Sequence, residues 1–103
     1  MRRLMVRYTV KQGHAETNEE LIRAVYRELH ELAPQGFRYA TFRLEDGLTF
    51  VHLAQVDGEV NPLVELPAFK AFTAGISERT DEPPHSSALS KIGTYRLFTE
   101  EES

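Results

Sequence analysis

The sequence feature that most constrains the fold is a pair of β-rich runs separated by Asp46-Gly47. The first run covers residues 37–45 and the second covers residues 48–56, and both are rich in aromatic and β-branched side chains. An Asp-Gly pair between two such runs is a strong hairpin signal, because a type I′ turn needs a positive φ at both central residues. We therefore expect an antiparallel hairpin with a two-residue turn in the middle of the chain.

The register of this hairpin sorts its side chains into two faces. A two-residue turn places Arg43 opposite Phe50 and Thr41 opposite His52. One face is small and apolar, and we expect the helices to cover it; it holds Arg38, Ala40, Phe42, Leu44, Thr49, Val51 and Leu53. The other face is mixed, and we expect no helix over it; it holds Phe37, Tyr39, Thr41, Arg43, Phe50, His52 and Ala54.

The segment before the hairpin predicts a strand and a long helix. Apolar side chains alternate over residues 4–10, which is the period of a strand. Thr17 and Glu20 have the spacing of a capping box. Apolar positions then recur every three or four residues over residues 21–32, which indicates an amphipathic helix.

The segment after the hairpin predicts a second helix and a last strand. The helix opens at Pro67, where a proline suits the first turn, and the strand covers residues 92–98. The order β-α-β-β-α-β is that of an α+β, ferredoxin-like fold with a four-stranded antiparallel sheet. We expect a single domain over residues 1–98, followed by an acidic tail over residues 99–103.

Composition excludes several classes of function. The 103 residues carry a net charge of −4, which opposes binding to nucleic acid or to anionic membranes. The chain has no cysteine, which excludes disulfides, thiolate metal sites and a cysteine nucleophile. Arg7 interrupts the first apolar stretch too early for a signal peptide, and no apolar run approaches the ~20 residues of a membrane span. We expect a cytoplasmic protein.

The mixed face of the hairpin predicts a partner. If helices cover only one side of the sheet, the aromatic side chains on the other side form an exposed apolar patch, which monomers seldom carry. Packing against a second copy removes this patch and closes two sheets into a barrel. We therefore expect a homodimer that forms through the sheet face.

Two stretches carry a resemblance to a known family. They are Val-Lys-Gln-Gly-His-Ala-Glu at residues 10–16 and Leu-Pro-Ala-Phe-Lys-Ala-Phe at residues 66–72. Together with the order of elements, they resemble the dimeric α/β-barrel proteins of the antibiotic biosynthesis monooxygenase type. The resemblance implies a dimer with a cavity in each protomer between sheet and helices. Some members oxidise polycyclic phenols with dioxygen and no cofactor, some degrade haem, and many have no known activity.

This chain departs from the family in the residues associated with chemistry. It has no tryptophan, whereas members with established chemistry generally use one in the cavity. The family's frequent histidine positions fall on Leu63 and Ala68. The resemblance therefore supplies the fold but no reaction.

His52 is the most interesting candidate for chemistry. It lies on the mixed face, where burial and a nearby guanidinium would lower its pKa and allow it to act as a general base. Arg43 and Tyr39 would then hold the developing anion. The competing interpretation is a cavity or interface histidine that is only hydrogen-bonded. We expect Arg7, Thr41 and Phe50 to line the pocket with these residues.

With these residues in place, the resemblance to the family implies a small enzyme, namely a cofactor-independent oxygenase or isomerase that acts on an aromatic or polyketide-like molecule in the cavity between sheet and helices. The alternative is a non-catalytic dimeric module that binds a hydrophobic small molecule or has a structural role. We expect no cofactor and no metal, since the four histidines have no ligand spacing. An RNA-binding reading of residues 36–42 is disfavoured by the acidic charge and because the aromatic signature falls on the second strand.

Overall fold

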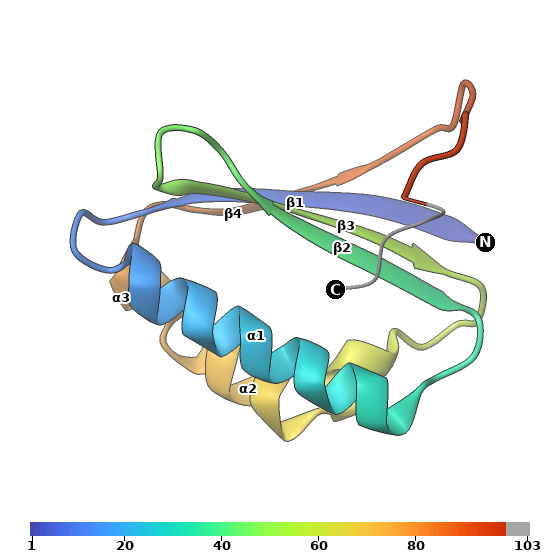
Figure 1. Ribbon diagram of the computed structural model, residues 1–103, viewed down its shortest axis with the longest axis horizontal. Helices are drawn as coiled ribbons and strands as arrows, with labels where there is room; N and C mark the ends of the chain where they lie inside the picture. The colour runs from blue at the N-terminus through green and yellow to red at the C-terminus, as the bar shows by residue number, and fades with distance from the viewer. Residues whose placement is uncertain (99–103) are drawn as a thin grey trace.

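A single antiparallel sheet covered by helices on one side makes up the fold. The structure is a computed structural model that describes residues 1–98. Its elements are β1 (Arg2–Val10), α1 (Ala15–Leu32), β2 (Phe37–Arg43), β3 (Thr49–Val56), the 3₁₀ helix η1 (Pro62–Glu65), α2 (Pro67–Ala74), α3 (Ile76–Arg79) and β4 (Thr80–Ala88). The strands lie in the order β2-β3-β1-β4, with all pairs antiparallel, and the helices lie under one face of the sheet (Figure 1). This arrangement confirms the predicted ferredoxin-like α+β class.

Helix α1 follows its apolar periodicity but begins earlier than predicted. The predicted capping box at Thr17 and Glu20 is wrong, because the helix begins at Ala15 with His14 as its N-cap. Both residues therefore lie inside the helix and are exposed to solvent. At the other end, Ala33 takes a left-handed φ of 47° and donates its backbone N–H to the carbonyl of Leu29, which ends the helix.

The central hairpin has the predicted register and a wider turn. Arg43 pairs with Phe50, and Thr41 pairs with His52. The turn is not type I′, because a backbone hydrogen bond of 2.9 Å already joins the Gly47 N–H to the Leu44 carbonyl, and of the Asp-Gly pair only Gly47 has a positive φ (76°). The Asp46 carboxylate instead accepts hydrogen bonds from the two backbone N–H groups that follow Gly47, at 2.8 Å each.

The assignment of the two sheet faces from the sequence is wrong. Helices cover one face of the sheet (Figure 1), and the burial of Phe50 and His52 identifies it as the mixed face, so the small apolar face is the open one. Phe50 and His52 on the mixed face are 1% and 6% exposed, and Tyr26 of α1 stacks on Tyr39 of β2. The mixed face can be buried because its hydroxyl and imidazole groups hydrogen-bond to one another. These polar groups therefore do not need water as a hydrogen-bond partner.

The open face carries apolar side chains together with charged and polar ones such as Arg7 and Arg38. Met5, Val51 and Leu53 are half-buried there, and Phe42 is 36% exposed. A dimer through the mixed face is therefore excluded by the helices, and the open face is the one that a second copy could cover. Within residues 1–98, no helix is long and apolar enough to cross a membrane.

The last strand also lies elsewhere than predicted. Residues 92–98 form no strand, and β4 is instead the preceding segment Thr80–Ala88, which contains Pro83 and Pro84. The paired prolines suggest a break, but β4 is an edge strand, where proline is tolerated because one row of backbone N–H groups needs no partner. The predicted tail at 99–103 lies outside the described residues.

Candidate functional site

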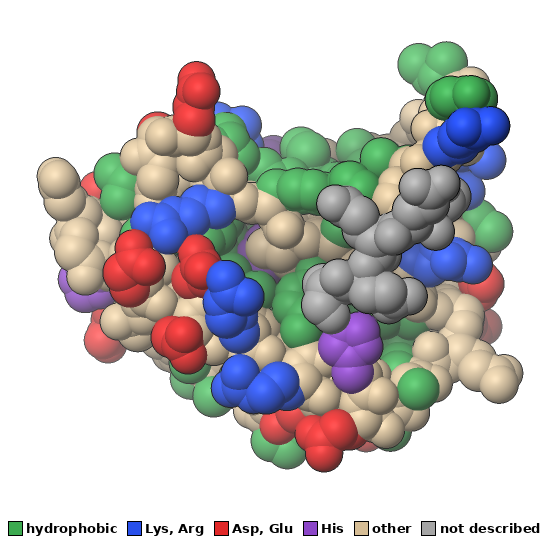
Figure 2. All heavy atoms as spheres, viewed as in Figure 1, with side chains coloured by type: hydrophobic (Ala, Val, Ile, Leu, Met, Phe, Trp, Pro, Cys, Tyr) green, Lys and Arg blue, Asp and Glu red, His purple; other side chains and the backbone are tan. Residues whose placement is uncertain are grey.

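An open cleft of about 970 Å³ lies between α1 and the β2 edge of the sheet. It is lined by Glu19, Ile22, Arg23, Tyr26, Arg27, His30, Tyr39, Ala40, Thr41, Phe42, Arg43, Phe50 and Phe98. Figure 2 shows charged side chains along the helix on one side of the opening and apolar side chains within it. The volume is in the range of small-molecule sites.

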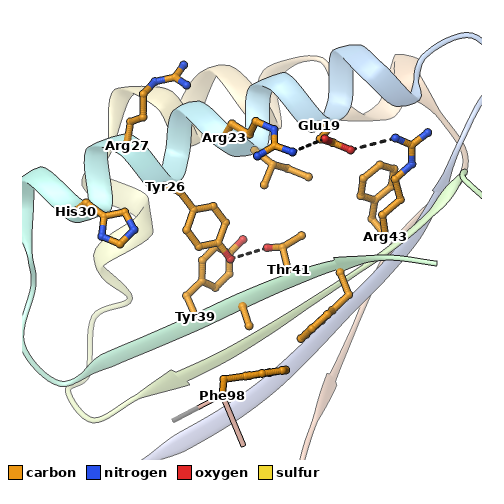
Figure 3. A pocket seen from close by; sticks show the side chains of 13 residues that line it. Glu19, Arg23, Tyr26, Arg27, His30, Tyr39, Thr41, Arg43 and Phe98 are labelled. Atoms are coloured by element: carbon orange, nitrogen blue, oxygen red, sulfur yellow. Dashed lines mark hydrogen bonds and ion pairs between the residues drawn. The ribbon is translucent and has the colours of Figure 1, made fainter. Parts of the chain in front are cut away.

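Two tyrosines and a threonine supply the hydroxyl groups of the cleft (Figure 3). The rings of Tyr26 and Tyr39 stack with centroids 5.3 Å apart. The Tyr26 hydroxyl lies 2.9 Å from Oγ1 of Thr41. Burial raises the pKa of Tyr26 to about 12 and raises the pKa of Tyr39 further, so both phenols are neutral across the physiological range and act as hydrogen-bonding groups.

His52 lies directly behind Tyr39, from the adjacent strand β3. Its Nδ1 is 2.5 Å from the Tyr39 hydroxyl and 3.3 Å from Oγ1 of Thr41. Its Nε2 is 2.8 Å from the hydroxyl of Tyr8 on β1. Burial lowers the pKa of His52 to about 4, so the imidazole is neutral near pH 7. The predicted lowering of this pKa is thus present, and burial is its cause.

The hydrogen bonds continue from Tyr8 to two residues on helices. Nδ2 of Asn18 on α1 donates to the Tyr8 hydroxyl at 2.9 Å, and Nε of Arg79 on α3 donates to Oδ1 of Asn18 at 3.2 Å. Asn18 is 0% exposed and Arg79 is 7% exposed. Arg79, Asn18, Tyr8, His52 and Tyr39 therefore form one buried chain of hydrogen bonds that ends at the cleft; we call it the polar chain.

Arg43 lies at the mouth of the cleft rather than beside His52. Its guanidinium forms ion pairs with Glu16 at 3.1 Å and with Glu19 at 3.0 Å, and its Nε donates to the Gly47 carbonyl at 2.9 Å. Hydrogen bonds with Glu16 and Glu19 raise the pKa of Arg43. Two carboxylates thus already balance its charge, and the cluster joins α1 to the end of β2.

The cleft brings together most of the residues expected at the site. The cleft is lined by Tyr39, Thr41, Arg43 and Phe50. His52 does not line it and lies behind Tyr39, whose hydroxyl it contacts. Arg7 does not line the cleft, because its exposed side chain lies on the open face of the sheet.

Sequence reasoning missed the deeper half of the polar chain. Asn18 could have been noticed, because it falls in helical register with buried Ile22 and Val25 and so lies on the core side of α1. Arg79 gave no signal, since its burial depends on the short helix α3 that precedes β4.

The described residues offer no ready metal site. Within residues 1–98, no group of three or more histidine, cysteine, aspartate or glutamate side chains is placed to hold a metal ion. The polar groups that line the cleft are hydroxyl and guanidinium groups, the Glu19 carboxylate and the His30 imidazole. The hydroxyl and guanidinium donors, together with the aromatic walls, suit an organic ligand that has an oxygen acceptor.

Comparison with known proteins assigns the fold to a recognised group. No protein-family profile and no curated protein matches the sequence. A putative antibiotic biosynthesis monooxygenase from Nitrosomonas europaea superposes with a TM-score of 0.73 at 16% identity, over 90% of this chain and 100% of that chain. SnoaB, a cofactor-independent oxygenase from Streptomyces nogalater, was solved as a mutant and gives 0.67 at 16% identity, over 93% and 97% of the two chains. The protein NE2512 of unknown function, also from Nitrosomonas europaea, gives 0.70 at 15% identity over 93% of each chain.

The chain therefore has the fold of the antibiotic biosynthesis monooxygenase-like proteins. The family resemblance read from the sequence is confirmed at the level of this fold, over nearly the whole length of its structural relatives. Since these identities are low and the group includes proteins of unknown function, activity has to be argued from the site.

Proposed function

We propose that the protein is a cofactor-independent oxygenase-like or isomerase-like enzyme that acts on a small aromatic molecule bound in the cleft. The observation that carries this proposal is the position of Tyr39, which lines the cleft and contacts His52 at 2.5 Å. Both reactions pass through an enolate or phenolate, and a neutral tyrosine donor at a cleft with aromatic walls stabilises such an anion. The likeness in fold to SnoaB, described as a cofactor-independent oxygenase, supports the same class.

The geometry favours a division of roles that differs from the one expected from the sequence. Both ring nitrogens of His52 face tyrosine hydroxyls, and its lowered pKa of about 4 makes the imidazole a weak base. We therefore assign His52 to holding Tyr39 in place, and Tyr39 to donating a hydrogen bond to the developing anion. The substrate proton leaves through the open mouth of the cleft to water. Arg43 is paired with Glu16 and Glu19, so we assign it to holding α1 against the end of β2 at that mouth and not to the anion.

An oxygenase reaction can be tested with 1,8-dihydroxyanthrone, a polycyclic phenol with an acidic CH₂ group. Loss of one proton gives its enolate, which reacts with O₂; the CH₂ carbon becomes a carbonyl and the second oxygen atom leaves as water. We expect the protein alone, without cofactor, to raise oxygen uptake above the rate without protein. Tyr39→Phe removes the donor and is expected to lower kcat about 10²-fold or more, the usual cost of losing one oxyanion donor.

Matched variants separate the roles at the site. Tyr95→Phe makes the same chemical change on a side chain that is 81% exposed, and its oxygen uptake is expected to equal that of the wild type. His52→Gln is expected to lower kcat less than Tyr39→Phe does. Unchanged turnover in Tyr39→Phe would show that the assigned role is wrong.

The competing class is a non-catalytic binding module. It predicts that the anthrone binds, which fluorescence titration of the ligand can measure, while oxygen uptake stays at the rate without protein. Absence of binding would show that this substrate class is wrong.

We also propose a cytoplasmic homodimer that forms through the open face of the sheet. Val51 and Leu53 support this interface, because they are only half-buried on a sheet face that no helix covers, and neighbouring apolar side chains are seldom left in water. We expect Val51→Lys to convert a dimer to a monomer in sedimentation equilibrium, whereas Val64→Lys, at a 50% exposed position on η1, should leave it a dimer. A monomeric wild type would remove this proposal.

A further inference from the structure

Arg79 is a buried cation without a carboxylate partner among residues 1–98. It is 7% exposed, and its polar contacts are Oδ1 of Asn18 at 3.2 Å and the Phe72 carbonyl at 2.8 Å. Its guanidinium also lies over the Phe72 ring, 5.3 Å from the centroid. Burying a charge without an opposite charge is costly, and the mechanism described above does not use Arg79.

Arg79 fixes the orientation of the next residue in the polar chain. A guanidinium can only donate hydrogen bonds, so the Asn18 atom that faces its Nε must be the amide oxygen. The amide nitrogen of Asn18 therefore points to Tyr8, 2.9 Å away. The Tyr8 oxygen accepts this hydrogen bond.

The direction of this hydrogen bond determines the proton on His52. Within residues 1–98, the other polar partner of the Tyr8 hydroxyl is Nε2 of His52 at 2.8 Å. If the Tyr8 proton is donated there, both groups are satisfied; if Nε2 carried the proton, the buried Tyr8 hydroxyl would have no acceptor among these residues. The single proton of the neutral imidazole therefore lies on Nδ1, which faces Tyr39.

The same logic carries the direction of donation to the cleft. Nδ1–H donates to the Tyr39 oxygen at 2.5 Å, so the Tyr39 proton is free for an acceptor elsewhere. That acceptor is either a ligand atom or the Thr41 hydroxyl, which contacts Tyr26 at 2.9 Å. Both tyrosines line the cleft. The donor at the cleft is Tyr39 when a ligand takes its proton, and it is Tyr26 when Thr41 takes that proton and donates its own to Tyr26.

We infer that Asn18 and Arg79 are positioning residues that direct every hydrogen bond of the polar chain toward the cleft and supply the buried counter-charge for an anionic oxygen of the ligand. The inference rests on the proposed function, since it names the ionic form of the ligand at the same site. The fitting ligand is a phenolate or enolate. Its negative charge at Tyr39 would be balanced, at a distance, by the otherwise unpaired cation of Arg79.

Asn18→Asp tests the direction of the polar chain with almost no change in shape. The new carboxylate pairs with Arg79 and has no N–H for Tyr8, so it must accept the Tyr8 proton. Nε2 of His52 then has to donate to Tyr8, and its Nδ1 becomes an acceptor. We expect ¹⁵N chemical shifts of the His52 ring to report Nδ1–H in the wild type and Nε2–H in Asn18→Asp, with assignment from the signals lost in His52→Gln.

The counter-charge is tested with 4-nitrophenol, whose ionised form is coloured. The pKa of the protein-bound probe is read from an absorbance titration. We expect it to be higher by about one unit, a tenfold loss in preference for the phenolate, in Asn18→Asp and in Arg79→Gln than in the wild type. Arg79→Lys retains the charge and should give a smaller rise, and Gln12→Glu adds the same charge as Asn18→Asp at an exposed position and should give none.

The outcomes separate this inference from the proposed function. An Nε2–H tautomer of His52 in the wild type would overturn the positioning role, and this measurement needs no ligand. A probe pKa that is the same in Arg79→Gln and in the wild type would overturn the counter-charge. If 4-nitrophenol does not bind although His52 carries Nδ1–H, the proposed site fails as a phenolate site, and the orientation of the polar chain still holds.

Discussion

Tyr8→Phe removes one oxygen atom from the centre of the polar chain and leaves the ring in place. Tyr8 is 2% exposed, and its ring stacks on Phe50 with centroids 5.7 Å apart. Phenylalanine keeps this packing, so the change in stability measures the hydroxyl. The oxygen has two partners, Nδ2 of Asn18 at 2.9 Å and Nε2 of His52 at 2.8 Å.

The size of the effect follows from what these two partners lose. Asn18 is 0% exposed and His52 is 6% exposed, so water has little access to replace the missing oxygen. A buried polar group left without a partner costs about 1–3 kcal/mol, while removing the buried hydroxyl itself recovers part of its desolvation. We expect Tyr8→Phe to lower the free energy of unfolding by about 2–4 kcal/mol, a large part of the ~5–15 kcal/mol typical of a domain.

Urea unfolding followed by circular dichroism measures this loss. All variants are compared at one protein concentration, because association with a second copy would make stability concentration-dependent. Tyr95→Phe, at an 81% exposed position, is the matched control and should be neutral within ~0.5 kcal/mol. Adding Asn18→Leu to Tyr8→Phe should cost less than Asn18→Leu alone, with a coupling of about 1 kcal/mol. A loss for Tyr8→Phe no larger than that of the control would refute the idea that the polar chain is fully hydrogen-bonded.

Three further predictions concern the backbone and the effect of pH. Gly36 has a φ of 71° and Gly58 has no positive φ, so Gly36→Ala should lower the free energy of unfolding by about 1–2 kcal/mol in urea melts, while Gly58→Ala should change it little. The pKa of Asp46 is lowered mainly by its hydrogen bond from Thr49, so the stabilisation by this carboxylate is present above the pKa of the unfolded state and is lost in acid. Asp46→Asn should therefore lower the urea midpoint at pH 7 and lower it less at pH 3, and an equal decrease at both pH values would contradict this. The pKa of His52 is lowered by burial to about 4, so the unfolded state binds its proton first; stability should fall as pH drops from about 6.5 to 4, and His52→Gln should flatten this slope in a pH series of melts.

Local sequence patterns predicted most of the elements and the hairpin register correctly, but they did not predict which face of the sheet the helices cover. The Asp-Gly turn and the alternating runs correctly gave the pairs Arg43–Phe50 and Thr41–His52. Which face the helices cover depends on whether the polar atoms on that face can satisfy one another. That in turn depends on residues such as Tyr8 and Asn18, which come from other elements.

The last strand shows a second limit of local reasoning. Residues 92–98 have the alternation of a strand, whereas Pro83 and Pro84 lie in a stretch with poor strand propensity. The place beside β1 is nevertheless taken by β4, because the chain reaches it directly from α3. The candidate site was half predicted for the same reason: Tyr39, Thr41 and His52 are neighbours within one hairpin, while Arg79 reaches them only through the complete fold.

The two prolines of β4 also affect how the molecule meets other copies of itself. The partners of β1 change from His85 to Glu82 between Arg7 and Thr9, so Pro83 and Pro84 occupy an irregular step in an edge strand. A strand that approaches this edge would find an N–H donor missing and a break in the repeat, which is a common protection against fibril-like growth of a sheet. We therefore expect the prolines to suppress edge-to-edge aggregation through β4 in the native state. Replacing them with strand-forming residues is expected to let this edge pair with other copies and to promote aggregation.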